Sequence, residues 1–167
     1  MDGFGLALML GGIAILVALA SYNAADPSWN TAATGAERTR NLMGAPGAYI
    51  GDLLLQTIGL AGALLGLITG FWGWRILRRM KISPLPLRIT LMIVTTLLGA
   101  VAFARIPSAG WMVHPFLGGA GGTLMLDHLA RISSGMFGAQ AHTVMAAAAA
   151  LLAIAALPFA LAIGAAE

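Results

Sequence analysis

The sequence predicts an all-α membrane protein with four transmembrane helices and a short interfacial or re-entrant helix between the third and the fourth. Three observations lead to this fold class. Of the 167 residues, 59% are hydrophobic and only 9% are charged, against about 25% charged residues in an ordinary soluble domain. Several uncharged runs approach the ~20 residues that a helix needs to cross ~30 Å of hydrocarbon. Finally, five of the nine Lys and Arg residues lie in one short stretch, as in a cytoplasmic loop.

The first predicted span covers residues 4–22 and contains no charged side chain. No basic segment precedes it and no small-residue cleavage pattern follows it, so we expect a retained helix rather than a signal peptide. An outer loop over residues 23–48 comes next. It is rich in turn-forming residues, and Tyr22 and Trp29 suit the headgroup level of a membrane.

The second predicted span, residues 49–74, carries one polar pair, Asp52 and Gln56, near its start. A carboxylate in the first turn of a helix lies close to the interface and to the positive end of the helix dipole, where it costs less than at mid-bilayer. We therefore expect a structural role for Asp52. A proton-relay or substrate-binding role is the alternative.

Small residues continue along the face of the second span that bears Asp52, at steps of three and four residues. This helix-packing seam contains Gly59, Gly62, Ala63, Gly66 and Gly70, and Gly73 extends it. Between helices in lipid, close approach of backbones over small residues supplies much of the attraction. The seam faces either another span of the same chain or a second subunit, and the sequence leaves both open.

A basic connector over residues 75–88 separates the second span from the third, and it contains no acidic residue. Its five basic residues are Arg75, Arg78, Arg79, Lys81 and Arg88. At the end of a span we expect them to set the topology and to anchor the chain to anionic lipid, with nucleic-acid binding as the alternative. The positive-inside rule then places the connector and both chain termini in the cytoplasm.

The third predicted span covers residues 89–104, and the outer segment over residues 105–142 is rich in glycine. Within this segment, residues 123–132 have apolar side chains on one side and Asp127, His128 and Arg131 on the other, which predicts the interfacial or re-entrant helix. The fourth predicted span covers residues 143–164, and Pro158 is expected to kink it.

The sequence offers little support for catalysis or metal binding. His114, His128 and His142 are spaced by fourteen residues, but zinc ligands usually come in closer pairs, so we expect interfacial side chains and no metal. There is no cysteine, and no nucleotide-binding or hydrolase motif. We expect neither a cofactor nor an enzymatic activity in this chain.

The chain resembles the N-terminal four-helix membrane region of FtsK/SpoIIIE-type DNA translocases, particularly those of alphaproteobacteria. The resemblance covers the whole chain and is sharpest in two stretches, residues 26–35 and residues 41–56. The loop motif that begins the first stretch consists of Asp26, Pro27, Ser28, Trp29 and Asn30. Family members often carry a basic tail before the first span, whereas three residues precede it here.

The resemblance implies a multi-pass anchor in the bacterial inner membrane at the division septum, ahead of a hexameric motor that pumps DNA during chromosome segregation. None of the motor's motifs occurs in this chain. We therefore expect a non-catalytic anchoring and assembly domain. Its expected partners are the lipid bilayer, envelope-side cell-division proteins and further copies brought together by the motor, without direct contact to nucleic acid.

Two other classes of function remain open. An oligomeric channel or small transporter is the main alternative, although the middles of the predicted spans are almost wholly apolar and transporters usually place polar groups there. An intramembrane enzyme is the third, and no catalytic pair supports it.

Overall fold

The structure is a computed structural model that describes residues 2–29 and 39–163. As predicted, it is all-helical over these residues, and four stretches are long and apolar enough to cross a membrane. These are Asp2–Ala20, Gly59–Leu77, Leu85–Phe103 and Gly119–Ala160. The helices are α1 (Asp2–Ala20), α2 (Gly44–Thr57), α3 (Gly62–Leu77), α4 (Leu85–Phe103), α5 (Gly119–Phe137) and α6 (Ala141–Ala160), with short 3-10 turns at Gly59–Ala61 (η1) and Gly138–Gln140 (η2).

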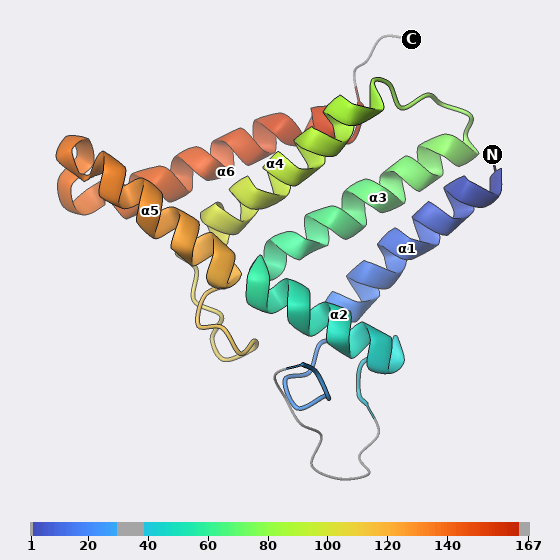
Figure 1. The fold of residues 1–167 in the computed structure, drawn as a ribbon, viewed down its shortest axis with the longest axis horizontal. Helices are drawn as coiled ribbons and strands as arrows, with labels where there is room; N and C mark the ends of the chain where they lie inside the picture. Colours follow the sequence, from blue (N-terminus) through green and yellow to red (C-terminus); the bar gives the residue numbers. More distant parts are fainter. Residues whose placement is uncertain (1, 30–38, 164–167) are drawn as a thin grey trace.

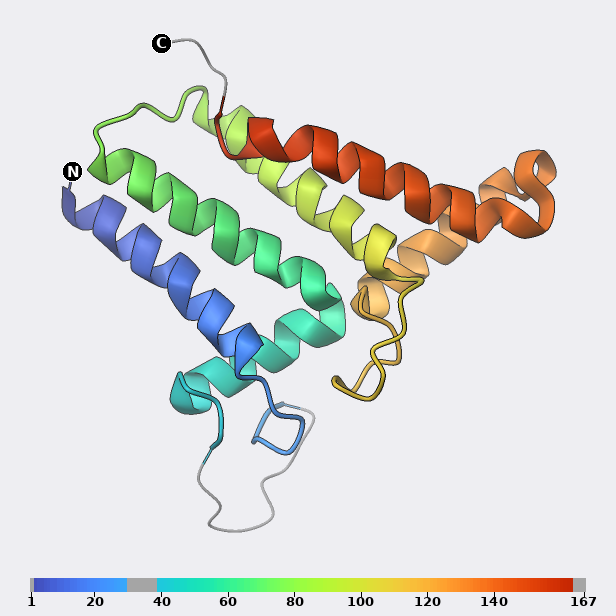
Figure 2. The same ribbon diagram turned by 180° about the vertical axis from the view of Figure 1, so that it is seen from behind.

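The four spanning helices form two antiparallel pairs, α1 with α3 and α4 with α6, which make the two most extensive contacts in the molecule (Figures 1 and 2). The contact between α3 and α4, which joins the pairs, is much smaller. The start of α1, the α3–α4 connector and the end of α6 all lie at one end of the bundle, here named the connector end. The loops that follow α1 and α4 lie at the opposite end, here named the loop end.

The second apolar run is divided, so the prediction of one continuous helix over residues 49–74 is wrong. α2 ends at Thr57, and α3 begins at Gly62 in a different direction (Figure 1). Gly59 between them has a φ of 63°, in the left-handed region that favours glycine. Its backbone packs directly against the chain that enters α5: the Leu60 amide donates to the Leu117 carbonyl at 2.7 Å, and a Cβ on Gly59 would lie 1.9 Å from that oxygen.

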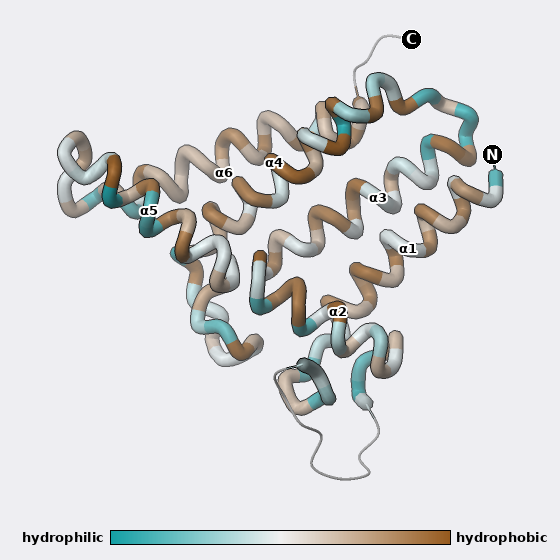
Figure 3. The backbone as a smooth tube through the Cα atoms, in the orientation of Figure 1, coloured by the Kyte–Doolittle hydropathy of each residue, from teal (hydrophilic) through white to brown (hydrophobic). Residues whose placement is uncertain are grey.

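α2 and α5 run across the loop end of the bundle and meet where α2 ends and α5 begins (Figures 1 and 2). The predicted interfacial helix over residues 123–132 is thus the central part of a longer helix. A separate helix α2 is not predicted, because its residues fall within the predicted outer loop and the predicted second span. Hydrophobic residues dominate α1, α3, α4 and α6, whereas hydrophilic residues gather in the connector, the loops and α5 (Figure 3).

α5 presents three different faces. Gly122, Leu126 and Ala130 are buried against the bundle. Met125, Leu129, Ile132 and Met136 form an exposed apolar flank, and Asp127, Arg131 and Ser134 lie exposed on the opposite flank. A helix with one apolar and one polar flank fits the membrane–water boundary.

α4 and α6 begin and end close to the predicted spans. α4 starts at Leu85, directly after Pro84, and Pro86 lies in its first turn, where a missing N–H costs nothing. Pro158 lies in the last turn of α6. Beyond that turn, Ala162 has a φ of 60° and the Ile163 amide donates to the Pro158 carbonyl, which closes the helix in the Schellman pattern.

Candidate functional site

Glycines bring the backbones of α1 and α3 into direct contact. A Cβ on Gly12 would lie 2.4 Å from the Gly70 nitrogen and 2.5 Å from the Gly66 oxygen. Nearer the connector end, a Cβ on Gly73 would lie 2.6 Å from the Gly5 oxygen. This is the close helix packing that small residues permit in lipid, where dispersion contacts replace the hydrophobic effect between helices.

The residues assigned to the seam from sequence do not share one partner. Gly66 and Gly70 face α1 of the same chain, and Gly62 lies between Leu19 of α1 and Leu54 of α2. Ala63 packs on the cluster around Leu19, and Gly59 meets residues 117–119. Asp52 and Gln56 belong to α2, so the stripe is interrupted at the break between the helices.

The glycines on the α1 side of this contact were not singled out from sequence. Gly5 and Gly12 are seven residues apart, a spacing that returns to the same helix face and that an examination of the first span for small residues would have found.

Asp26 holds together the ends of the loop between α1 and α2, at the loop end. Its buried carboxylate accepts hydrogen bonds from the backbone amides of Arg40 and Asn41, both at 2.8 Å. Asn41 in turn donates through Nδ2 to the Ala18 carbonyl at 2.8 Å, and Ser21 Oγ accepts from the Leu42 amide at 3.1 Å. The carbonyls at the end of a helix lack partners within the helix, so Asn41 also caps α1.

The other residues of the family-like loop motif lie around Asp26. Pro27 and Ser28 are half-buried, and Asn30 lies outside the described residues. Trp29 is exposed, and its ring meets the ring of Tyr49 edge-on at 5.2 Å between centroids. Asp26 is therefore the structural centre of the motif, and Trp29 is its accessible part.

Asp52 joins the end of α1 to α2. Its buried carboxylate accepts a hydrogen bond from the Tyr22 hydroxyl at 3.0 Å and two from Gln56 Nε2 at 2.8 Å. Burial, followed by the hydrogen bond to Asp52, raises the pKa of Tyr22 well above its ordinary value, which keeps the hydroxyl protonated and donating. The ring of Tyr22 also meets edge-on the ring of Trp111, in the loop between α4 and α5, so the cluster links α1, α2 and both loops of the loop end.

The basic connector separates into buried and exposed residues. Arg75 and Arg88 are buried, so the expectation that all five basic residues contact lipid is wrong for these two. Arg75 Nη2 donates to the Lys81 carbonyl at 3.2 Å, and Arg88 donates to the carbonyls of Phe159 and Ser83. Arg78, Arg79 and Lys81 are exposed, and the Arg78 guanidinium lies 5.9 Å from the centroid of the Trp74 ring.

The end of α6 explains why Arg88 is buried. The final carbonyls of a helix lack partners within the helix. Here the Ala162 amide donates to the Phe159 carbonyl, and two side chains of other helices add hydrogen bonds. Trp72 Nε1 of α3 donates to the Ala160 carbonyl at 2.8 Å, and Arg88 of α4 donates to the Phe159 carbonyl. The point at which the chain leaves α6 is therefore fixed to both helix pairs.

The three histidines do not come together. His142 Nε2 lies 3.2 Å from Asp127 Oδ1, between the start of α6 and α5, and both side chains are largely exposed. His114 Nδ1 accepts a hydrogen bond from the Phe116 amide at 3.2 Å within the loop between α4 and α5. Among residues 2–29 and 39–163, no three His, Asp or Glu side chains are grouped closely enough to hold a metal.

Comparison with known proteins assigns these helices to a family. The family model described as the 4TM region of DNA translocase FtsK/SpoIIIE matches residues 1–165. The chain belongs to this family. The resemblance inferred from the loop motif is thus confirmed, and the helix pairs and loops described above are those of an FtsK 4TM region.

Proteins named DNA translocase FtsK resemble the chain over much of its length. The chain is 36% identical over 167 residues to that of Caulobacter vibrioides, covering 94% of this chain and 19% of that protein. It is 34% identical over 132 residues to that of Azospirillum brasilense, covering 78% and 21%. The FtsK 4TM region described here thus spans about a fifth of the length of these relatives. No solved structure matches it.

Together, the four apolar helices and the family show a multi-pass region of an inner-membrane protein. The matched FtsK 4TM region is the membrane part of a DNA translocase and not its motor.

Proposed function

We propose that this chain anchors a DNA translocase in the inner membrane at the division septum and takes part in septal assembly during cell division and chromosome segregation, without a catalytic role of its own. The observation that carries the proposal is the arrangement of the ends. The start of α1, the end of α6 and the basic connector lie together, and the polar loops lie at the far end (Figures 1 and 3).

The distribution of charge supports a cytoplasmic location for the connector end. Arg78, Arg79 and Lys81 are exposed there, and cytoplasmic loops are those enriched in Lys and Arg. With the connector inside, both termini are inside as well. A motor that followed α6 would then start on the side of the membrane that holds the chromosome.

The bonded end of α6 suits an anchor. Any segment that continues from α6 begins next to the carbonyls held by Trp72 and Arg88, so its starting position is fixed relative to the bundle. An anchor for a motor needs such a defined exit, because the force on the linker acts at this point.

The loop end provides the surface that we assign to envelope-side division proteins. Trp29, Trp111 and Val113 are exposed there, on loops held in place by Asp26, Asp52 and the pairing of Pro107 with Phe116. Exposed aromatic side chains on an ordered backbone are typical of protein interfaces. Further copies of the chain would be gathered through the parent motor.

Septal targeting is tested by fusing a fluorescent protein after Glu167 and imaging dividing cells of an alphaproteobacterium. We expect a band at mid-cell, and a double substitution of the exposed aromatics, Trp29→Ala with Trp111→Ala, should disperse it along the membrane. The matched control, Phe159→Ala, removes an aromatic that is equally exposed but lies at the connector end. Uniform membrane fluorescence of the unaltered fusion would refute the septal role.

A further inference from the structure

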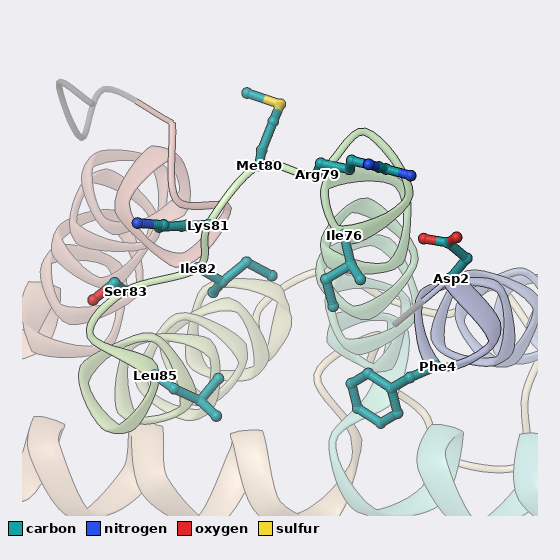
Figure 4. Close-up of a pocket in the computed structure, with 9 residues that line it drawn as sticks. All are labelled: Asp2, Phe4, Ile76, Arg79, Met80, Lys81, Ile82, Ser83 and Leu85. Atoms are coloured by element: carbon teal, nitrogen blue, oxygen red, sulfur yellow. The ribbon is translucent and has the colours of Figure 1, made fainter.

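We propose that the cavity at the connector end binds one anionic glycerophospholipid, with its headgroup at the rim that carries Arg79 and Lys81 and its acyl chains between α1, α3 and the start of α4 (Figure 4). The cavity has a volume of about 820 Å³. That lies within the roughly 300–1,000 Å³ typical of sites for small organic ligands.

The cavity lies at the connector end, where the two helix pairs are also joined by the hydrogen bond from Trp72 of α3 to the Ala160 carbonyl of α6. Gly99 of α4 packs against Leu64 and Ala61 near the start of α3. At the other end of α3, the extended connector crosses from one pair to the other, and the space beneath it is lined by residues of α1, α3 and α4 (Figures 1 and 4). A space of this kind inside a bilayer is open to lipid.

The lining changes from apolar to charged along the cavity, as a phospholipid does along its length. Ile76, Ile82 and Phe4 point into the space between the helices, and Leu85 closes its lower side (Figure 4). Arg79 and Lys81 lie on the rim, on opposite sides of the opening, and their charged groups extend outward in opposite directions (Figure 4). Lys and Arg at this depth hold the phosphates of lipid headgroups while their stems cover apolar surface.

The balance of charge at the rim favours an anionic headgroup. Asp2 is the one acidic side chain among the lining residues, and it lies on the Arg79 side of the opening (Figure 4). It also occupies the first turn of α1, where the helix dipole already stabilises a carboxylate. No acidic residue occurs between Asp52 and Asp127, so the two cations of the rim face only this one carboxylate from the lining.

The backbone of Arg79 ends α3 in the left-handed conformation. Its φ is 58°, and its amide and that of Met80 donate to the carbonyls of Ile76 and Arg75, which is the Schellman ending of α3. Glycine is the usual residue at this left-handed position, because a Cβ there is strained. Ala162 ends α6 in the same way, so the conformation belongs to the helix ending.

The left-handed conformation of Arg79 also allows a substitution that is not expected to weaken the fold. Arg79→Gly removes the guanidinium and relieves the strain, so a loss of lipid in this variant does not arise from a weakened fold. Ile82→Trp fills the cavity while both cations remain. Arg78→Gln and Arg79→Gln form a matched pair, because they make the same change at adjacent exposed positions. They differ in that Arg78 lies against Trp74 and does not line the cavity.

The test is native mass spectrometry of the full chain released from detergent, after titration with phosphatidylglycerol or phosphatidylcholine. We expect one phosphatidylglycerol to stay bound in preference to phosphatidylcholine. Loss of a hydrogen bond between charged groups corresponds to about a tenfold weaker affinity, so Arg79→Gly and Arg79→Gln should show a reduction of that size. Ile82→Trp should also displace the lipid, and Arg78→Gln should leave its binding unchanged.

Three results would overturn the proposal. Equal losses in Arg78→Gln and Arg79→Gln would mean a diffuse attraction to surface charge, and equal retention of the two lipids would mean that the headgroup charge is not recognised. A lipid-free dimer as the main species would mean that a second copy fills the cavity. The lipid proposal uses the proposed orientation in one respect only: a connector end in the cytoplasm would take its lipid from the cytoplasmic leaflet. Because the measurement in detergent does not depend on orientation or septal targeting, its failure is distinct from theirs.

Discussion

The contact between α1 and α3 gives the sharpest test of the packing, because two neighbouring glycines of α1 have opposite surroundings. A Cβ added to Gly12 would lie 2.4 Å from the Gly70 nitrogen, whereas one added to Gly11 meets nothing within 4 Å. Ordinary contact begins at 3.4 Å, so Gly12→Ala must move two backbones apart by about 1 Å. Neither backbone can turn aside as a flexible side chain would.

We expect Gly12→Ala to lower the free energy of unfolding by about 1–3 kcal/mol, the usual cost of overpacking. Gly11→Ala, one residue away in the same helix, should have almost no effect. The assay is reversible unfolding of the two variants in mixed micelles of mild detergent and sodium dodecyl sulfate, followed by tryptophan fluorescence, since Trp72 and Trp74 lie on α3. Equal stability of the Gly11 and Gly12 variants would refute direct backbone contact between α1 and α3.

Other predictions concern the loop end, the end of α6 and α5. Asp26→Ala removes the acceptor of two backbone amides, so the amides of Arg40 and Asn41 should lose their protection from hydrogen exchange. The amide of Leu60, which is bonded to the Leu117 carbonyl, is the control and should keep its protection. Unchanged exchange at Arg40 would contradict the loop arrangement. Arg88→Met should destabilise the chain by about 1–3 kcal/mol in the same unfolding assay, because it removes the hydrogen bond from the charged guanidinium to the Phe159 carbonyl, which then keeps the Ala162 amide as its donor. Arg79→Met, at an exposed position, is the control. Equal effects of the two substitutions would argue against the role of Arg88 at the end of α6. The chain has no cysteine, so a single introduced thiol reports on the exposure of its own position. In membranes, Arg131→Cys should react with a water-soluble maleimide, and Ile132→Cys should not. Equal labelling of the two variants would contradict an interfacial position of α5.

Sequence reasoning captured the features that depend on composition and local pattern. Apolar runs predicted four spans, and the alternation of apolar and charged residues around Asp127 and Arg131 predicted a further helix before the last span. Such features follow from each segment's own interaction with lipid and water.

The missed features depend on contacts between distant segments. The break after Thr57 rests on Gly59, whose left-handed backbone is matched by the chain near Leu117, almost sixty residues away. Hydropathy could not reveal it, because the residues around Gly59 are as apolar as those of a continuous span. Arg88 is another example, because its buried side chain donates a hydrogen bond to the Phe159 carbonyl at the end of α6. A count of positive charges cannot separate such an arginine from one that faces lipid.

The central claim is that the connector end faces the cytoplasm, with the loop end outside, and a pair of reporter insertions tests it most directly. An alkaline phosphatase, active only outside the cytoplasm, is inserted either after Ser83 in the connector or after Gly110, whose surroundings in the second outer loop are open. We predict an inactive reporter at Ser83 and an active one at Gly110. The reverse pattern, with activity at Ser83, would contradict the account.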